Sequence, residues 1–364
     1  MSTLTIGLAI AGGLVLAGVV AHGAWNTRRN APRMAQPELN PVPEGQERAD
    51  PHMGSALDGE HSAIVEHEQV RAENRRKDFD SNLVPLAALD KKPLLDALID
   101  VIAPIAVDGE VAGELALQVL PATRRAGSKP FSIEGYNRFT EVWELPRAGQ
   151  RYNAFQAGVQ LANRTGALND IEYSEFVVKT QAFADAVGGT PEFPEMREQV
   201  ARARELDQFA SSHDAQLGFT LRARATAWSP GYVQQNAARQ GLVPGVIPGR
   251  MVLPAATVGL PPVLGLAFDT QAALADDPEQ SALRSVTLSL DVPQVARSEQ
   301  AFMRMRDVAI ALAASMDGVI SDDQGQVIRV EALDAIGADL EKLYDTLDAR
   351  DLSAGSLQAR RLFS

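Results

Sequence analysis

The chain has 364 residues, of which 45% are hydrophobic and 22% are charged, and its formal net charge is −13. This length allows two folded domains, and the acidic balance argues against a nucleic-acid-binding protein, which needs clustered Lys and Arg. The sequence has no cysteine and five histidines, which excludes disulfides and thiolate catalysis and disfavours a His-based catalytic or metal site. We therefore expect no cofactor and no metal.

The first element expected along the chain is a membrane anchor at residues 4–25. From Leu4 to Trp25 the sequence carries no ionised side chain, and roughly 20 apolar residues span a bilayer core as a helix. No Lys or Arg precedes this run, whereas Arg28 and Arg29 follow it, which is the reverse of a cleaved signal peptide. Because Lys and Arg stay on the cytoplasmic side, we expect an uncleaved single-pass anchor with the N-terminus outside and the rest of the chain in the cytoplasm.

A flexible polar tether is expected next, over residues 26–85. The stretch is rich in Pro, Glu, Asp, Gln and Arg and shows no sustained apolar period, which is typical of a segment that cannot bury enough surface to fold. As a flexible coil of about 60 residues, it has a root-mean-square reach on the order of 40–45 Å. We therefore expect the remainder of the chain to stay near the membrane.

From residue 94 the pattern changes to core-forming elements, and the same order occurs twice. Residues 94–211 and 214–350 each show a strand, a helix, three strands and a helix, followed by a further amphipathic helix. This order indicates an α+β fold of two tandem split-βαβ repeats, each an antiparallel sheet with helices on one face. The last residues, 353–364, are expected to form a loose tail.

The internal similarity is clearest in one helix and one strand of each repeat. At an offset of 129, YSEFVVKTQAFADAVGG (173–189) aligns with FMRMRDVAIALAASMDG (302–318), and both segments have apolar rows at helical spacing that end at a glycine, Gly189 or Gly318. The runs FQAGVQL and RSVTLSL, just before these helices, align at the same offset. Their alternation predicts strands with one buried face and one open face.

Capping residues mark several helix boundaries. Asp108 is expected to cap the first helix of the first repeat, and Ser229 with Pro230 is expected to open its counterpart in the second. A last amphipathic helix is expected around residues 330–347. Its apolar face consists of Leu333, Ile336, Leu340, Leu343 and Leu347.

Several stretches resemble the ZipA family, bacterial inner-membrane proteins that bind the tubulin-like division protein FtsZ. VVAHGAWNTRR resembles the end of the family's anchor, GEVAGELALQVLPA (109–122) resembles its first domain helix, and VTLSLDVPQV (286–295) with MDGVISDD (316–323) resembles the end of its FtsZ-binding domain. The resemblance implies a non-enzymatic adaptor at the division site. It also implies that a helix-free sheet face receives the C-terminal tail of FtsZ.

We expect the partner to bind the open face of the second repeat, because a sheet face without helices must be solvated or covered. If Phe219 and Leu221 face the helices, the alternate residues of that strand face the other way, together with alternate residues of its neighbours. This face is more polar than the resemblance implies, with Ser289 where an aromatic side chain is expected. The predicted partner-binding residues are Thr220, Arg222, Arg224, Gly265, Ala267, Thr287 and Ser289.

Three alternatives stay open at this point. The first repeat could be the binding lobe, through Tyr136, Phe139, Trp143 and Phe155. The protein could be a membrane-tethered cytoplasmic scaffold with a different partner, and it could self-associate. A membrane-anchored enzyme is disfavoured, because the carboxylate pairs Asp276–Asp277 and Asp322–Asp323 stand beside Pro or Gly in expected turns.

Overall fold

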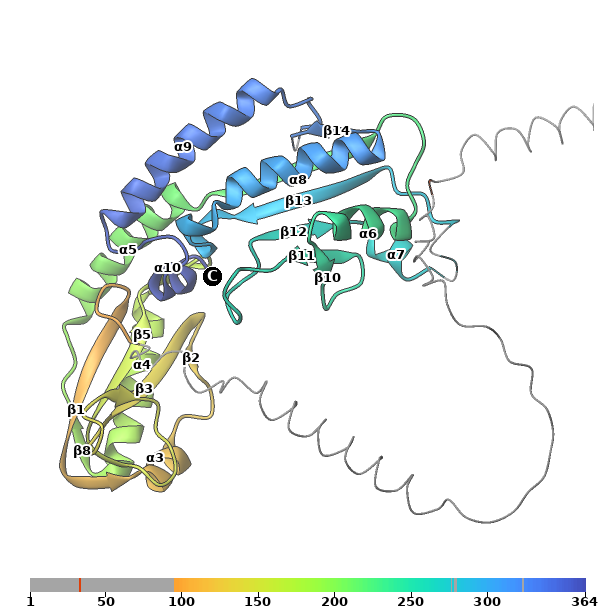
Figure 1. Cartoon of the computed structure of the whole chain (residues 1–364). Coiled ribbons are helices and arrows are strands. Elements are labelled where there is room, and N and C mark those ends of the chain that lie inside the picture. The colour runs from red at the N-terminus through yellow and green to blue at the C-terminus, as the bar shows by residue number, and fades with distance from the viewer. Residues whose placement is uncertain (1–32, 34–94, 276, 278–279, 323) are drawn as a thin grey trace, which may run out of the picture.

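The structure is a computed structural model that describes residue 33 and residues 95–364 except 276, 278–279 and 323 (Figure 1). The predicted anchor lies outside the described residues, as does the predicted tether apart from Arg33. Among the helices that the structure describes, none combines the length and the apolar character needed to cross a bilayer.

The first repeat is an antiparallel sheet of strand order β2-β3-β5-β1-β8, with β4 paired to β3. Its elements alternate with helices as predicted, which confirms an α+β fold. They are β1 (Asp100–Ala112), α3 (Gly113–Val119), β2 (Arg125–Ala126), β3 (Lys129–Asn137), β4 (Trp143–Glu144), β5 (Arg151–Gln160), the small hairpin β6 (Ala162–Asn163) and β7 (Gly166–Ala167), α4 (Asp170–Val187), β8 (Gly189–Pro191) and α5 (Met196–His213).

The second repeat has its own six-stranded antiparallel sheet, in the order β10-β11-β12-β13-β9-β14. Its central order β12-β13-β9-β14 reproduces β3-β5-β1-β8, so the duplication extends to topology, and the two sheets are separate. The elements are β9 (Gln216–Ala223), α6 (Pro230–Arg239), β10 (Val243–Pro244), β11 (Arg250–Leu253), β12 (Leu264–Ala267), α7 (Thr270–Ala273), β13 (Ser285–Asp291), the 3₁₀ turns η3 (Val292–Gln294) and η4 (Arg297–Glu299), α8 (Ala301–Met316), β14 (Gly318–Ser321), α9 (Val330–Asp348) and α10 (Leu357–Leu362).

The core of each repeat lies between its sheet and its long helix, as the strand alternation predicts. Phe155 of β5 contacts Phe183 of α4, with ring centroids 5.1 Å apart, and Phe219 of β9 contacts Phe302 of α8 at 6.4 Å. Edge-to-face aromatic pairs of this kind add to the free energy gained by burying the rings. The predicted apolar face of α9 also faces inward: Leu333, Leu340 and Leu347 are buried, and Ile336 and Leu343 are partly buried.

The first helix begins later than the cap prediction placed it. The pairing of β1 with β5 shifts register between Ala106 and Val111 and then continues to Ala112, so Asp108 lies within an irregular part of the strand. Helix α3 begins only at Gly113, and its N-cap Ala112 makes no side-chain capping bond. The prediction at Asp108 was wrong because continued strand pairing outweighs a local capping signal.

Other helix boundaries agree with the sequence or differ by one residue. Ser229 caps α6 as predicted, its hydroxyl accepting from a backbone N–H in the first turn. The left-handed residues that end α4 and α8 are Gly188 (φ +67°) and Asp317 (φ +54°), one position before the predicted glycines. Gly189 and Gly318 instead begin the edge strands β8 and β14. The strand β8 was not predicted.

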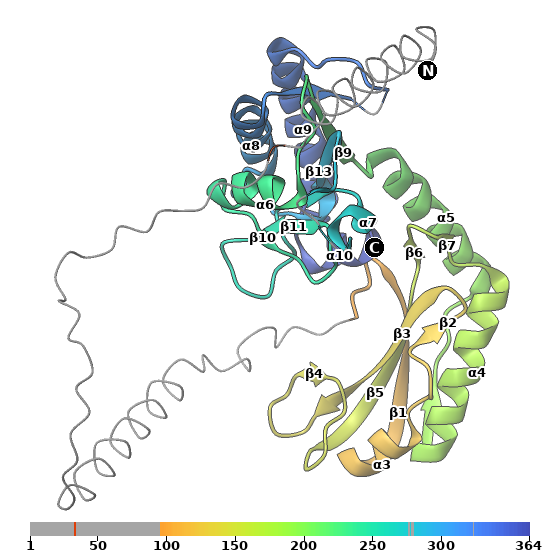
Figure 2. The same ribbon diagram turned by 90° about the vertical axis from the view of Figure 1, so that its right-hand side faces the viewer.

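The C-terminal residues, expected to be a loose tail, instead form α10 and lie between the two repeats (Figures 1 and 2). We call residues 353–364 the C-terminal clasp. Leu362 and Phe363 are each 1% exposed, and the Arg361 guanidinium pairs with the buried Asp100 at 2.6 Å. The prediction failed because the apolar residues and the arginine find their partners far away in sequence.

The clasp also bonds to both repeats through main-chain oxygens. The Gln160 side chain of the first repeat donates to the Arg361 carbonyl (2.8 Å), and the Gln294 side chain of the second donates to the Phe363 carbonyl (2.7 Å). Beside it, Arg164 of the first repeat bonds the carboxylates of both Asp214 and Asp291 in pairs of contacts between 2.6 and 2.8 Å. The two repeats therefore share one polar junction.

Arg33, inside the predicted tether, is held against the second repeat. Its N–H donates to the Ala227 carbonyl (2.7 Å), its carbonyl accepts from the Ser229 N–H (2.9 Å), and it forms a parallel bridge with Trp228. Its guanidinium lies 2.9 Å from the Asp317 carboxylate. At this residue the prediction of a free coil was wrong, because backbone pairing fixes the chain.

A pH-dependent contribution to stability is expected from Tyr152, whose side chain is fully buried in the first repeat. Burial, together with the nearby Glu144 carboxylate, raises the pKa of Tyr152 to about 12. The unfolded chain loses this proton near pH 10, so the contribution is complete below pH 10 and is lost as the pH rises towards 12. We expect the midpoint of urea unfolding to fall less steeply with pH above pH 10 in Tyr152→Phe than in the unsubstituted protein. An unchanged slope would contradict this role.

Candidate partner-binding site

The strand register brings five of the seven predicted binding residues into two neighbouring rows on the open face of the second repeat. In one row Ala267 of β12 lies opposite Thr287 of β13, which lies opposite Thr220 of β9. In the other row Gly265 lies opposite Ser289. Alternation along each strand places the core residues on the other face, so these five residues share one face of the sheet.

The two rows form a shallow and polar floor. Ser289 is exposed, and Thr220, Thr287, Gly265 and Ala267 are half-buried. The Ser289 hydroxyl donates to the Gly265 carbonyl at 3.3 Å, and a side chain added at Gly265 would approach that hydroxyl within 2.9 Å. This part of the face therefore offers hydroxyl groups and close access to backbone rather than an apolar pocket.

Of the two predicted arginines, Arg222 is the one that strand alternation places on this face. It stands one row beyond Thr220, opposite Val319 of β14, and its guanidinium lies close to Gly325. Arg224 follows the end of β9 at Ala223 and its Nε donates to the Gly318 carbonyl (3.2 Å). Strand alternation does not extend to Arg224, so its place on the face stays a prediction.

Two residues of the same face were missed by the sequence reasoning. Val252 of β11 lies opposite Gly265, and Arg250 lies opposite Ala267. The alternation in GRMVL was the available signal, since Met251 and Leu253, which alternate with these two residues, are buried. A hollow of about 420 Å³ at one end of the face is lined by Ala267, Phe268, Asp269, Ala282, Leu283, Arg284, Ser285 and Thr287.

The four aromatic residues proposed as the alternative site in the first repeat occupy different environments. Phe155 is fully buried in the core and is not available to a partner. Tyr136 and Trp143 lie opposite each other on the open side of β3 and β4, with ring centroids 5.3 Å apart. Phe139, in the turn between these strands, is 70% exposed.

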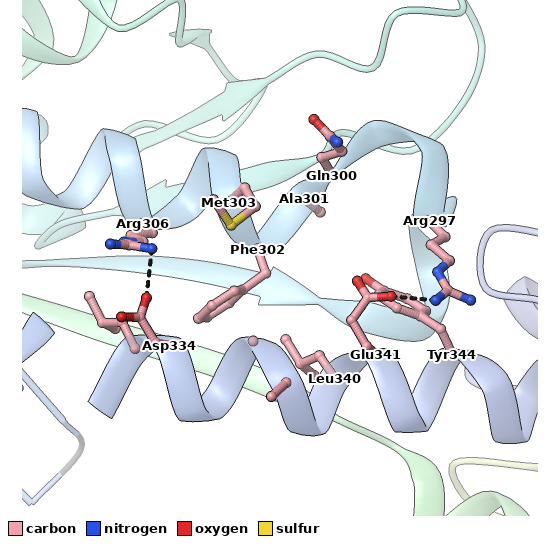
Figure 3. Close-up of a pocket in the computed structure, with 13 residues that line it drawn as sticks. Arg297, Gln300, Ala301, Phe302, Met303, Arg306, Asp334, Leu340, Glu341 and Tyr344 are labelled. Atoms are coloured by element: carbon pink, nitrogen blue, oxygen red, sulfur yellow. Dashed lines mark hydrogen bonds and ion pairs between the residues drawn. The ribbon is translucent and has the colours of Figure 1, made fainter. Parts of the chain in front are cut away.

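A groove of about 480 Å³ lies on the helix side of the second repeat, between α8 and α9 (Figure 3). Phe302 and Leu340 point into it, and ion pairs join its walls at Arg306–Asp334 (2.8 Å) and Arg297–Glu341. Because both arginines are already paired with carboxylates of α9, the groove presents no net excess of cations to a ligand. It also lies away from the open face on which the predicted residues converge.

The carboxylates that were weighed as part of an enzyme site, and the ring of His213, have local structural partners. The Asp322 carboxylate accepts from the Gln326 N–H (2.8 Å) in a turn, and Asp276 and Asp323 lie outside the described residues. The His213 ring stacks on Phe209 with centroids 4.3 Å apart, and its Nδ1 lies 2.7 Å from the Phe209 carbonyl. Over the described part of the chain, no cluster of three or more His, Asp or Glu side chains could hold a metal.

Lys129 of the first repeat is a buried ammonium group that also has structural partners. Its Nζ donates to the Asn163 side chain (2.8 Å) and to the Thr165 hydroxyl (3.2 Å). Burial lowers the pKa of Lys129, and the nearby Glu172 carboxylate opposes this shift. The residue is 1% exposed, so a substrate could not reach its amine in this conformation.

The comparison with protein families finds a match that lies within the second repeat. Residues 273–338 match the ZipA C-terminal FtsZ-binding domain, which confirms the resemblance to the ZipA family over this segment. The match spans β13, α8 and β14 and therefore includes Thr287 and Ser289 of the open face. No curated protein matches the chain.

Proposed function

We propose that this ZipA-type protein is an inner-membrane cell-division adaptor that binds the C-terminal tail of FtsZ. The observation that carries the proposal is the match of residues 273–338 to the FtsZ-binding domain of ZipA. That segment contains β13, a central strand of the second sheet. We therefore assign FtsZ binding in cell division to the open face of the second of the two split-βαβ repeats.

The chemistry of the open face suits a short segment that carries acidic as well as apolar side chains. Gly265 and Ala267 leave room for a peptide to approach the sheet, and Val252 offers an apolar contact beside them. Arg222 and Arg250 add cations to a face of a protein whose net charge is −13. Charge complementarity of this kind mainly sets specificity and the association rate, while a few buried side chains of the ligand supply affinity.

We further propose that residues 4–25 anchor the protein, with the N-terminus outside and both repeats in the cytoplasm. The contact of Arg33 with the second repeat supports a short distance to the membrane. Residues 26–32, between the proposed anchor and this contact, can span at most about 25 Å when fully extended. The second repeat would then lie close to the bilayer, nearer than a free tether over residues 26–85 would hold it.

The proposal predicts that Thr287→Glu weakens binding of a labelled FtsZ C-terminal tail peptide by about tenfold or more. The new side chain would occupy the middle of the row between Thr220 and Ala267 and would repel an acidic ligand. The measurement is fluorescence anisotropy of the peptide with the full chain in lipid nanodiscs. The matched control is Ala314→Glu, which places the same side chain on an exposed position of α8, on the helix side.

Saturable binding that survives Ala314→Glu but not Thr287→Glu would support the assignment. Equal binding by both variants would move the site off this face. If the folded, unsubstituted protein binds no peptide, tail recognition is wrong, and a membrane-tethered scaffold with another partner becomes the better account.

A further inference from the structure

The open face of the first repeat carries a row of mostly apolar side chains that crosses the sheet. Thr190 of β8 lies opposite Ala106 of β1, which lies opposite Ala154 of β5. Ala154 in turn lies opposite Tyr136, and Tyr136 lies opposite Trp143. Two alanines therefore lie beside a pair of aromatic rings, and we call the residues from Ala106 to Trp143 the aromatic row.

Further exposed apolar side chains lie close in sequence to the two aromatic rings. In the segment between β3 and β5, Phe139 is 70% exposed and Val142 is 36% exposed. Neighbouring apolar side chains left in solvent mark interaction sites more often than scattered single ones do. The comparable rows of the second repeat, which contain Thr287 and Ser289, are more polar.

The chain itself shows that this face accepts an apolar side chain. Leu95, which precedes β1, is 6% exposed and covers Gly158, where an added side chain would lie 2.4 Å from the Leu95 Cδ2. The Leu95 N–H donates to the Glu134 carboxylate (3.2 Å). This contact occupies the part of the face nearer the C-terminal clasp and leaves the row through Ala106 and Ala154 open.

An exposed arginine lies beside the aromatic row. Arg151 precedes Ala154 along β5, and its carbonyl accepts from the Arg138 N–H (3.0 Å) just after the end of β3. Arg138 is paired with Glu110, so it adds no net positive charge. An arginine beside apolar side chains matches a ligand that has apolar side chains next to a carboxylate, the same chemistry that Arg222 and Arg250 give the second repeat.

From these observations we infer that the first repeat is a second docking site for the same tail peptide, so that one chain captures two FtsZ tails. The inference rests on the proposed function, because the strand order β3-β5-β1-β8 duplicates β12-β13-β9-β14 of the ZipA-type repeat. FtsZ filaments present many tails, and two linked sites raise avidity by about 10²- to 10⁴-fold when both can engage.

The test is isothermal titration calorimetry of the tail peptide into the full chain in nanodiscs. We expect two peptides per chain, one peptide after Ala154→Glu, one after Thr287→Glu, and none after both substitutions. Val178→Glu, at a position of α4 that is 67% exposed on the helix side, is the matched control and should keep both sites. Trp143→Ser, at the edge strand β4, should remove the same site as Ala154→Glu and replaces that variant if it fails to fold.

The outcomes separate this inference from the proposed function. One peptide per chain, lost with Thr287→Glu and kept with Ala154→Glu and Trp143→Ser, overturns the second site and leaves the proposed function standing. One peptide per chain, lost only with the first-repeat substitutions, overturns the assignment to the second repeat and keeps a first-repeat site. No binding by the folded chain overturns both.

Discussion

Replacing Arg361 by methionine is expected to lower the free energy of unfolding by about 3–5 kcal/mol, the range found when one partner of a buried ion pair is removed. The Arg361 guanidinium makes two contacts with the Asp100 carboxylate, at 2.6 and 2.8 Å. The Asp100 side chain is fully buried and that of Arg361 is 15% exposed. The substitution therefore leaves a carboxylate without its main counter-charge inside the junction of the two repeats.

The loss should also depend on pH in a defined direction. Burial raises the pKa of Asp100, and the hydrogen bond and charge of Arg361 oppose that rise. Without Arg361 the pKa rises further. A raised pKa in the folded state means that stability is greatest in acid and is lost as the pH increases through that pKa. The difference between Arg361→Met and the unsubstituted protein should therefore shrink as the pH is lowered.

Urea unfolding of the full chain measures this effect, and a double-mutant cycle with Asp100→Asn isolates the pairing term. We expect the double variant to be more stable than Arg361→Met alone, because no buried charge is left unpaired. The control is Arg306→Met, which breaks an ion pair with an exposed carboxylate and should change stability by at most about 1 kcal/mol. A loss from Arg361→Met no larger than this would show that the clasp is not docked in solution.

The clasp also limits how binding can be assigned to one repeat. Cutting the chain between the repeats would separate Arg164 from Asp214 and Asp291 and would leave Asp100 without Arg361. An isolated first repeat would thus expose buried polar and apolar groups, and its failure to bind would say little about its open face. Point substitutions in the full chain avoid this difficulty.

Much of the fold could be predicted from the sequence because its signals are local. Strand alternation predicted which faces are buried, and the cap at Ser229 was confirmed. The two sheets nevertheless differ in register. Pro191 of β8 and Ile320 of β14 are related by the offset of 129, but the row through Pro191 reaches Phe155 in β5. The row through Ile320 reaches Val286 in β13, which is 131 residues after Phe155. A slip of two residues keeps every side chain on its face, so alternation alone could not detect it.

The junction could not be predicted in the same way. Its contacts join Arg361 to Asp100 and Phe363 to Gln294, and such long-range pairs leave no period in the sequence around 353–364. The apolar residues in ARRLFS were the available signal, and their neighbouring arginines obscured it. The open-face residues could be predicted more easily, because strand register places alternate residues on one face. That argument did not extend to Arg224, because β9 ends at Ala223.

The second large effect is expected from Gly355→Ala, at the turn that leads into α10. Gly355 has φ +77°, and an added Cβ would lie 2.3 Å from the Ala296 backbone nitrogen and 2.6 Å from its Cα. Its N–H donates to the Pro293 carbonyl at 2.9 Å. Because backbone on both sides is fixed by packing, the clash can be relieved only by moving the clasp away from the second repeat.

Gly149 provides a matched control for the cost of placing alanine in a left-handed backbone conformation. It has φ +78°, and nothing lies within 4 Å of an added Cβ, so Gly149→Ala tests the left-handed conformation alone, at about 1–2 kcal/mol. Gly355→Ala should cost that amount plus roughly 1–3 kcal/mol for the steric conflict. Urea unfolding gives both values, and hydrogen exchange of the α10 amides shows where the structure opens. Equal losses of unfolding free energy at the two glycines would mean that the clasp adjusts without strain. Faster hydrogen exchange confined to α10 and η3 in Gly355→Ala would establish that this turn holds the repeats together.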